Sequence, residues 1–550
     1  PPPPPPPPLP PPPPPPPNPP RLSSAASDVY KRQGTFLGHP KGLFVLFFAE
    51  MWERFSFYGM RALLIFYLVQ HWMFSDSEAG VIYGAYGALV YVTPVIGGYL
   101  ADRYLGQRKA VAFGALLLTF GHFLMAFEGG GAGQADPAIN IFWAALAFII
   151  VGSGFLKANI SVIVGQLYSR TDIRRDPAYT IFYMGINLGA ALGAIIAGWL
   201  GQTYGWSYGF GAAGVGMLFG LVVFVWGRPL LVGRGEPSDP ARLERKLAGI
   251  KFEWFLYILS FAAVGLVWIL IRYQALVGSL LGFAGAILVL YVLYTAVAKL
   301  ASDDRDRIFA AMFLIFGSIL FWALFEQAGS SLNLFTDRSV DRRIFGIEVP
   351  ASVFQSINAI YIVLLAPIFA LFWTFLGRRG LEPSAPAKFG LGLMQLGAGF
   401  LVLVAGALAA GTGNLTPVVF IFLIYLLHTT GELCLSPVGL SAMNRLAPRH
   451  MASLIMGTWF FASATGNFAA GIIAAAVGAE GAGLDHILEV YSSVGWFSVD
   501  VGVGVIVISP LIRKLMHLDT LADEHVDDSL EGQREVGEPQ AAGIHPTTKS

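Results

Sequence analysis

The strongest chemical signal in the sequence is a group of charged residues inside an apolar stretch near position 50. Glu50, Glu53, Arg54, Tyr58 and Arg61 are spaced so that a helix would carry them on one face. Charged side chains within a membrane span are costly, so they usually face a cavity or a partner. Carboxylates in such a cavity can exchange protons, and guanidinium groups can bind anions. The spacing therefore predicts a polar cavity beside this helix.

Polar residues also interrupt later apolar stretches. Lys157 lies in one of them, and Glu326 shares a helical face with Trp322 in another. Glu432 is followed by Ser436 and by Pro437, which cannot complete a helical hydrogen bond and is expected to kink its helix. Asn187 and Asn358 are two further amides within apolar stretches. Each could belong to the polar cavity or form a packing hydrogen bond between helices.

The charges are divided between the two halves of the chain. The first half contributes the buried cations Arg54, Arg61 and Lys157. The second half contributes the lone carboxylates Glu326 and Glu432. A zwitterion would fit this division, with its carboxylate toward the cations and its amine toward Glu432. The placement predicts a proton-linked carrier of a small zwitterion.

The elements that position these residues are membrane spans. Of the 550 residues, 55% are hydrophobic and only 13% are charged, which is too little polar material for a soluble chain of this length. The apolar residues form blocks of about 20, the length that crosses a bilayer as a helix. About fourteen spans are predicted, near 43–70, 79–102, 110–128, 139–167, 178–200, 207–226, 252–272, 276–298, 308–332, 350–376, 389–410, 416–444, 451–478 and 487–512.

Composition argues against several other classes of protein. The net charge of zero gives no basic field for nucleic acid. The single cysteine, Cys434, permits neither a disulfide framework nor a cysteine-based metal site. The sequence contains no phosphate-binding loop of the G-x-x-x-x-G-K-[ST] type, so an ATP-driven pump within this chain is not expected. No cofactor and no metal is expected; the coupling ion would be the proton.

Basic residues concentrate in alternate loops, which predicts that both termini face the cytoplasm. The loop 336–348 departs from this rule, because Arg338, Arg342 and Arg343 lie beside Asp337 and Asp341 on the predicted external side. Acidic neighbours would explain the departure.

Three segments resemble one transporter family. The segment 50–59 (EMWERFSFYG) resembles the E-x-x-E-R-F-x-Y-Y-G signature of the proton-dependent oligopeptide transporters, segment 182–189 (FYMGINLG) their span-five motif, and segment 431–441 (GELCLSPVGLS) their G-E-L-x-L-S-P-V-G-L motif. The resemblance runs from about residue 41 to 514. Segment 97–109 (GGYLADRYLGQRK) resembles the loop motif of the wider major facilitator superfamily, which supports the fold but not a substrate.

The resemblance implies an all-α major facilitator fold, with two six-helix bundles and two extra helices between them, as in bacterial members. The expected organisation is a disordered or artefactual Pro-rich segment (1–33), an N-terminal bundle (34–228), a linker with two extra spans (229–304), a C-terminal bundle (305–518) and a disordered tail (519–550). It implies a monomeric symporter of di- and tripeptides in the inner (plasma) membrane.

Roles follow from the resemblance residue by residue. Proton coupling is implied for Glu50, Glu53, Arg54 and Glu326. Salt-bridge gating is implied for Arg61, Lys157, Glu326 and Glu432. Substrate binding is implied for Arg54, Tyr58, Arg61, Lys157, Asn187, Trp322, Asn358, Glu432, Ser436 and Trp459. The sequence departs from the family at Phe57, where the signature has tyrosine, and at Ala158 and Ala359, where proline is frequent.

Other functions remain open at this point. The same fold could carry nitrate, a drug or an amino acid, and a peptide-sensing receptor would bind peptide without accumulating it. A membrane enzyme is disfavoured, because the one G-x-S-x-G match, at 205–209, starts a predicted span and lacks the strand-turn-helix context of a nucleophile elbow.

Overall fold

The computed structural model describes residues 34–518 except 131–132, 169–171, 173, 238, 248, 412 and 482. The two terminal segments that the sequence predicts to be disordered lie outside these residues. The first six long helices are α2 (Lys41–Phe66), α3 (Asp76–Leu100), α4 (Gln107–Met125), α5 (Ile139–Gln166), α6 (Arg175–Tyr204) and α7 (Trp206–Trp226). The next two are α9 (Phe252–Arg272) and α10 (Gln274–Lys299). The remaining ones are α11 (Ser302–Phe325), α13 (Ser356–Arg378), α14 (Ala385–Ala410), α15 (Val419–Leu446), α16 (Ala452–Val477) and α17 (Leu484–Leu515).

Short elements extend or connect these helices. The π-helical segments η1 (Tyr67–His71) and η2 (Ala101–Leu105) continue α2 and α3. The other short helices are η3 (Arg228–Leu231), α8 (Pro240–Glu244), η4 (Glu326–Gly329), α12 (Ser331–Ser339), η5 (Ala351–Gln355) and η6 (Arg449–Met451). Two-residue strands pair as β1 (Thr35–Phe36) with β2 (His39–Pro40), β3 (Lys246–Leu247) with β4 (Ile250–Lys251), β5 (Val340–Asp341) with β8 (Thr416–Pro417), and β6 (Arg343–Ile344) with β7 (Ile347–Glu348).

Every predicted span has a helical counterpart in the structure. Within the described residues, 13 helical segments are long and apolar enough to cross a membrane. Helix α2 is not among them although it has 26 residues, because Glu50, Glu53 and Arg54 lie in every 18-residue stretch of it. The charges that lower its hydropathy are the same charges that predict the cavity.

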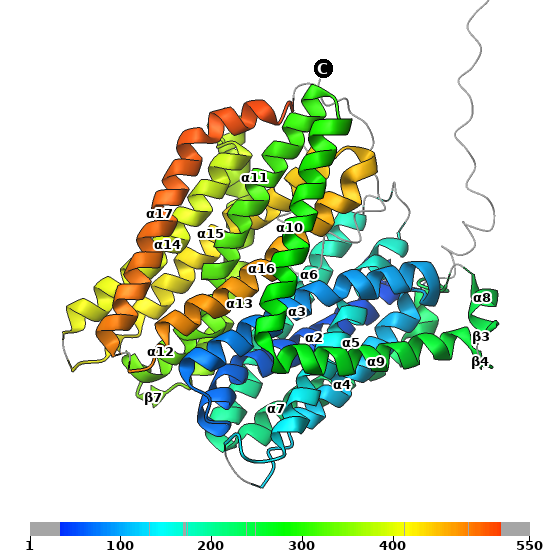
Figure 1. Cartoon of the computed structure of the whole chain (residues 1–550), viewed down its shortest axis with the longest axis horizontal. Coiled ribbons are helices and arrows are strands. Elements are labelled where there is room, and N and C mark those ends of the chain that lie inside the picture. Colours follow the sequence, from blue (N-terminus) through cyan, green and yellow to red (C-terminus); the bar gives the residue numbers. More distant parts are fainter. Residues whose placement is uncertain are drawn as a thin grey trace, which may run out of the picture.

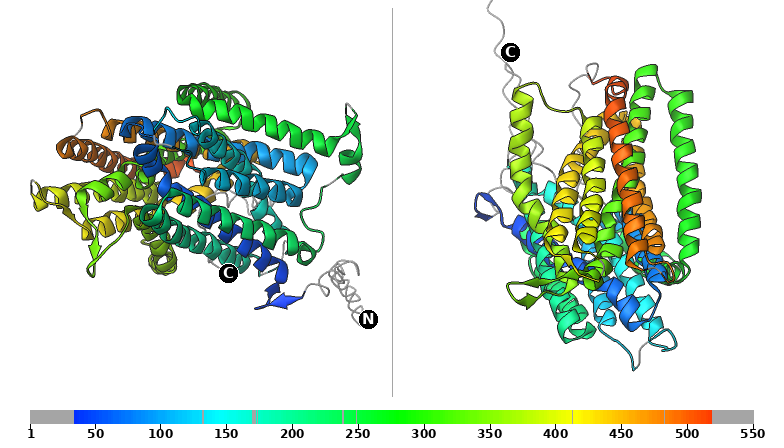
Figure 2. Two further views of the ribbon diagram at one scale, coloured as in Figure 1. Left: turned by 90° about the horizontal axis from the view of Figure 1, so that it is seen from below. Right: turned by 90° about the vertical axis from the view of Figure 1, so that its left-hand side faces the viewer.

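The helices form two bundles that meet at one end. In the first bundle α2 packs on α6 and α7, and α4 packs on α5; in the second, α14 packs on α15 and α17, and α11 packs on α16. The bundles touch through α3 with α16 and through α6 with α13. Figure 1 shows them converging near α12 and diverging toward the opposite end, and Figure 2 gives two further views. The predicted fold class is confirmed; the domain limits stay a prediction.

Glycines allow the two bundles to approach closely at the α12 end. A Cβ atom on Gly84 of α3 would lie 2.6 Å from Cα of Gly471 in α16, and one on Gly80 would lie 2.9 Å from Cβ of Ala474. Such distances are too short for any larger residue, so these glycines are needed for backbone contact between the helices. This close contact of α3 with α16 holds the bundles together at the α12 end.

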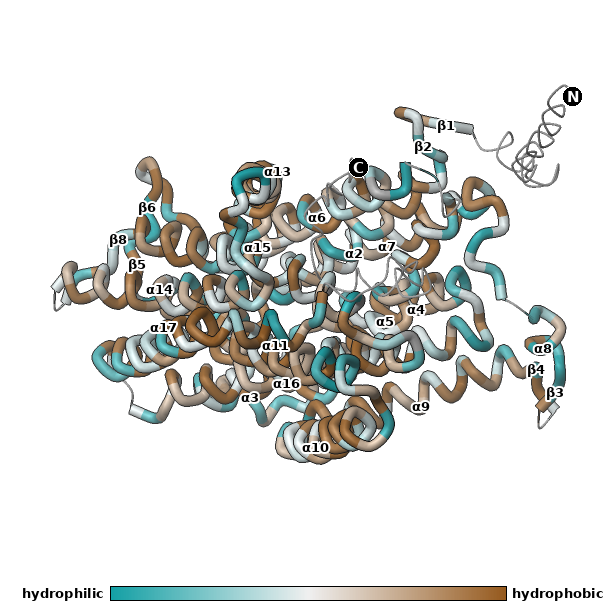
Figure 3. The backbone as a smooth tube through the Cα atoms, turned by 90° about the horizontal axis from the view of Figure 1, so that it is seen from above, coloured by the Kyte–Doolittle hydropathy of each residue, from teal (hydrophilic) through white to brown (hydrophobic). Residues whose placement is uncertain are grey.

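Helices α9 and α10 are consecutive and lie outside both bundles, and Figure 1 shows them running in different directions from their connection. Helix α9 packs on α5, while α10 contacts α3 of the first bundle and α11 and α16 of the second. Apolar side chains such as Leu266, Phe283 and Leu290 point outward from this pair and are more than half exposed. The brown colour along α9 and α10 in Figure 3 shows this hydropathy. An apolar exterior of this kind is what a lipid-facing surface requires.

Candidate functional site

The charged face of α2 forms a buried cluster of two carboxylates around one guanidinium. Arg54 Nε donates a 2.6 Å hydrogen bond to Glu50 Oε1 and lies 3.1 Å from Glu53 Oε2. All three side chains are buried. Within the described residues, Glu50 Oε2 and both oxygens of Glu53 accept no hydrogen bond. Two carboxylates share one cation, so a proton taken up by either would reduce the unbalanced negative charge.

Lys157 of α5 faces this cluster but pairs differently from the expectation. An ion pair with a carboxylate of α2 is predicted, yet Lys157 forms no ion pair within the part of the chain that the structure describes. Its ammonium instead lies 3.7 Å from the centre of the Phe57 ring and 5.6 Å from that of Tyr91. Cations are attracted to the face of an aromatic ring. Phe57, the position that departs from the family signature, thus supplies the contact with Lys157.

An ion pair between the bundles joins α2 to the break in the α11–α12 helix. Arg61 Nη2 pairs with Glu326 Oε2, and Arg61 Nε donates a 2.6 Å hydrogen bond to Tyr83 Oη. Helix α11 ends at Phe325, and η4 turns Glu326 toward the first bundle. A Cβ atom on Gly329 would collide with the Tyr83 hydroxyl, so glycine at this turn lets Tyr83 reach Arg61.

The second bundle contributes an amide–carboxylate contact. Asn358 Nδ2 of α13 donates 3.0 Å hydrogen bonds to Glu432 Oε2 and to Thr429 Oγ1, both on α15. Glu432 Oε1 forms no hydrogen bond within the described residues, so this oxygen can accept one from a ligand. The carboxylate is therefore held by one amide and remains available on its other side.

One cavity lies between the bundles and brings several predicted site residues together. Its lining includes Tyr58, Arg61, Asn187, Trp322, Glu326, Asn358 and Glu432. Glu50, Glu53, Arg54 and Lys157 are not part of this lining. Two other predicted residues are placed elsewhere: Ser436 is buried, and Trp459 packs against Gly439 and Phe389.

The cavity also contains residues that the motifs do not single out for it. Tyr91, Tyr425, Gln355 and His428 line it together with the predicted residues. His428 Nε2 lies 3.2 Å from the carbonyl oxygen of Leu396, a hydrogen bond within the protein interior. Single tyrosines and glutamines within apolar helices carry no spacing signal, so only their place in the tertiary structure reveals them.

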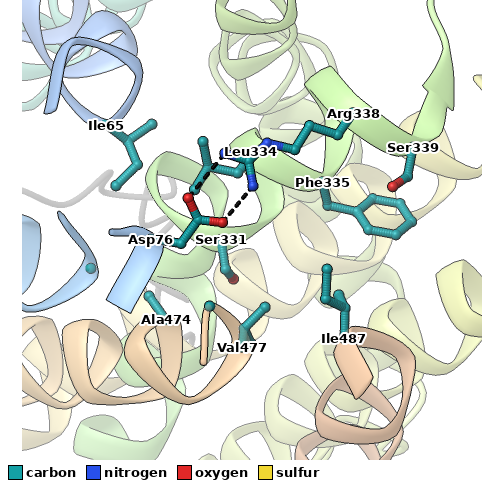
Figure 4. A pocket seen from close by; sticks show the side chains of 12 residues that line it. Ile65, Asp76, Ser331, Leu334, Phe335, Arg338, Ser339, Ala474, Val477 and Ile487 are labelled. Atoms are coloured by element: carbon teal, nitrogen blue, oxygen red, sulfur yellow. Dashed lines mark hydrogen bonds and ion pairs between the residues drawn. The ribbon is translucent and has the colours of Figure 1, made fainter. Parts of the chain in front are cut away.

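The cavity is closed toward the α12 end by contacts between the bundles. Asp76 of α3 forms a two-point ion pair with Arg338 of α12, beside a small pocket lined by Val477 and Ile487 (Figure 4). Asn333 Nδ2 donates a 3.1 Å hydrogen bond to the carbonyl of Ala62. Figure 1 shows the two bundles diverging from this closed end toward the opposite one.

The basic residues that break the charge rule have acidic partners. Arg338 pairs with Asp76, and Arg342 lies 3.3 Å from both Asp337 and Glu348. Arg342 thus has the acidic loop neighbour Asp337 that the explanation expects, whereas the partner of Arg338 is Asp76 of α3, outside the loop.

Loss of the Asp76–Arg338 pair is expected to loosen this closure. An exposed ion pair contributes up to about 1 kcal/mol, so Asp76→Asn should increase opening at this end by up to about fivefold. The measurement is the rate at which a membrane-impermeant maleimide labels a cysteine placed at Val477, since the native Cys434 is buried. The control is Glu348→Gln, which removes an ion pair within one bundle. Equal labelling of the two variants would contradict the assignment of a closing role.

Comparisons with a family model, with related sequences and with solved structures all point to the same protein family. Residues 108–482 match the family model described as PTR2, POT family. Peptide transporter YePEPT of Yersinia enterocolitica is 37% identical, over 88% of this chain and 96% of its own length. The di-/tripeptide transporter of Lactococcus lactis subsp. cremoris is 34% identical, over 88% of this chain and 98% of its own length. The crystal structure of a mutant of peptide transporter POT in complex with alafosfalin superposes with a TM-score of 0.76 at 36% identity, covering 88% of this chain and 97% of that one.

Proposed function

This chain belongs to the POT family of membrane transporters, and on that premise we propose that it is a proton-coupled symporter that imports di- and tripeptides by alternating access. The observation that carries the proposal is the cavity between the bundles, which presents the Arg61 guanidinium from α2 and the Glu432 carboxylate from α15. A short peptide is a zwitterion whose ends need these two charges. Relatives that align along nearly their whole length are named as peptide transporters, which supports the same cargo.

The two ends of the peptide find different partners in this proposal. The peptide amine donates to Glu432 Oε1, whose neighbouring oxygen is already held by Asn358. The peptide carboxylate binds on the side of Arg61, which lines the cavity; Lys157 forms no ion pair within the described residues and lies against the Phe57 ring behind that lining. Asn187 and Trp322, which line the same cavity, contact the peptide backbone and side chains.

In this proposal the protons bind to two buried carboxylates, Glu326 and Glu53. Protonation of Glu326 removes its charge and releases Arg61, which weakens the contact between the bundles at this level. Protonation of Glu53 reduces the excess negative charge around Arg54. A bound ligand moves a conformational equilibrium only by its difference in affinity for the two states. Release of Arg61 to the peptide carboxylate supplies such a difference.

The membrane orientation is part of the same proposal. The closed end carries the Asp76–Arg338 contact, and most of the basic loops lie at the other end, which supports an extracellular position for the closed end. The chain would then open inward, with both termini in the cytoplasm, in the inner (plasma) membrane of a bacterial cell. We propose a monomer as the functional unit, because each bundle interface that forms the cavity lies within one chain.

Uptake of labelled dialanine into liposomes that contain only this protein tests the function. With an inside-alkaline pH gradient and a negative-inside potential, the wild type is expected to accumulate dialanine above the external concentration. Dissipating the gradient should abolish the accumulation. Glu53→Gln should abolish it as well, because the glutamine cannot gain or lose the proton.

The matched control is Glu480→Gln, which removes an exposed acid outside the cavity. Binding of dialanine without accumulation would indicate a sensor. A folded protein that neither binds nor transports dialanine would indicate another cargo in the same fold, to be sought among nitrate, amino acids and drugs.

A further inference from the structure

A lateral groove of about 680 Å³ separates α10 from the second bundle. One wall consists of α10 from Gly278 to Leu290, and the other consists of parts of α11 and α16. The small residues Gly278, Gly282 and Gly285 make the α10 wall shallow, and no atom lies within 4 Å of a Cβ placed on Gly282. The groove lies apart from the central cavity and shares none of its lining residues.

The groove presents no free polar side chain in the part of the chain that the structure describes. Its two hydroxyl side chains, Thr458 and Thr465, each donate to a backbone carbonyl in their own helix, at 2.7 Å to Leu454 and 2.9 Å to Phe461. Water in a cavity needs two to four polar partners, and apolar cavities stay dry. The groove therefore favours an apolar occupant, because its only polar side-chain partners for water are the remaining acceptor positions of these two hydroxyls.

We propose that an acyl chain of a membrane phospholipid occupies this groove and packs α10 against the second bundle. From Gly278 to Leu290 the α10 wall extends for roughly 18 Å at 1.5 Å per residue. Half of the hydrocarbon core of a bilayer is about 15 Å thick. The length of the groove thus matches that of one acyl chain. This acyl chain would belong to the leaflet that lies nearer the start of α10.

A basic residue, Arg272, precedes the α10 wall of the groove by six positions in the chain. Arg272, at the end of α9, is exposed, and its guanidinium lies 5.3 Å from the Trp268 ring and 6.0 Å from the Tyr273 ring. Aromatic and basic residues of this kind are typical of the membrane interface. The charge of Arg272 complements a lipid phosphate, so we expect an anionic phospholipid to be preferred.

The position of the groove gives the lipid a mechanical role. Helix α10 contacts α3 of the first bundle as well as α11 and α16 of the second, and Figures 1 and 2 show it standing beside the second bundle. An acyl chain in the groove fills the space between α10 and two helices of that bundle. The inference depends on the chain crossing a bilayer and not on which solute it carries.

Photolabelling of the full-length protein in nanodiscs tests the proposal. The discs would contain phosphatidylethanolamine with a small fraction of phosphatidylglycerol bearing a diazirine in its acyl chain, and the labelled peptides would be identified by mass spectrometry. Segments 278–290 and 461–472 should be labelled about tenfold more than the exposed face of α13, which corresponds to roughly 1.4 kcal/mol of preferential binding. Uniform labelling of α10, α13 and α17 would overturn the proposal, as would crosslinks showing that a second copy fills the groove.

Variants sharpen the test. Gly282→Trp should fill the groove and abolish the enrichment, whereas Gly265→Trp on α9, where a Cβ also meets no atom within 4 Å, should preserve it. Arg272→Gln should remove the preference for phosphatidylglycerol over phosphatidylethanolamine, measured by placing the diazirine on one lipid or the other. Unchanged enrichment in Gly282→Trp would overturn the proposal. If that variant does not fold, the wild-type labelling pattern still decides between a bound chain and ordinary annular lipid.

Discussion

Replacing Glu432 by glutamine should raise the KM for dialanine by at least about 30-fold, because removing one partner of a buried charged contact costs at least roughly 2 kcal/mol. The glutamine keeps the size of the side chain and can still bond to Asn358, but it no longer carries the charge that balances the peptide amine. Initial rates of uptake into proteoliposomes would be measured with dialanine and with N-acetyldialanine. The wild type should prefer the free amine strongly, and Glu432→Gln should lose most of this preference.

Thr429→Val is the matched control for this prediction. It removes only a neutral hydrogen bond to Asn358, which contributes about 0.5–1.5 kcal/mol, so KM should rise by no more than roughly tenfold. The preference for the free amine should remain, since the carboxylate is intact. An unchanged KM together with a retained preference in Glu432→Gln would show that the amine binds elsewhere.

Glu326→Gln should separate peptide exchange from proton-driven accumulation. Glu326 pairs with Arg61 across the bundles and is 3% exposed, so its charge decides whether Arg61 is free to meet the peptide. Without a titratable group at this position the pH gradient cannot drive that release. The accumulation ratio of dialanine should fall to that of passive equilibration, while exchange of labelled for unlabelled dialanine across the same membrane continues.

The control for the Arg61–Glu326 pair is Glu253→Gln. Glu253 of α9 accepts a 2.7 Å hydrogen bond from Lys109 Nζ of α4 and lies away from the cavity, so loss of this carboxylate should leave accumulation unchanged. Arg61→Met provides a second variant, which leaves a buried carboxylate without a partner and should reduce both exchange and accumulation by at least about 100-fold, for a cost of roughly 3–5 kcal/mol. Persistent accumulation in Glu326→Gln would contradict a coupling role for Glu326 and leave the α2 carboxylates, which Glu53→Gln tests, as the coupling groups.

Helix positions could be predicted from the sequence because they depend on local properties. Lipid provides no partner for a free backbone amide, so any apolar stretch of about 20 residues must become a helix. The predicted span 252–272 coincides with α9 for this reason. The largest difference between predicted and observed helix limits is at the predicted span 308–332, because the helical segment continues through η4 and α12 to Ser339. The extension is stabilised by contacts of Asn333 and Arg338 with the first bundle, which no local pattern encodes.

The composition of the site could be predicted in part. The helical period places Glu50, Glu53 and Arg54 together, and the structure has them in contact. Asn358 and Glu432 are predicted only as separate residues, and their hydrogen bond depends on the rotation of α13 against α15. Trp459 is expected from the family resemblance at the pocket wall, but the structure buries it against Gly439.

By itself the sequence determined the membrane-spanning helices, the charged face of α2 and the presence of carboxylates in the second half. Each of these follows from the order of residues within one helix. Tertiary structure alone decided that Arg61 pairs with Glu326, that Lys157 rests on the Phe57 ring instead of pairing with a carboxylate, and that the bundles close at the α12 end. The physical reason is the separation along the chain over which each property acts. Hydropathy and helical period depend on about 20 consecutive residues. The partner of a buried charge depends on the distance and orientation of helices that lie far apart in the chain.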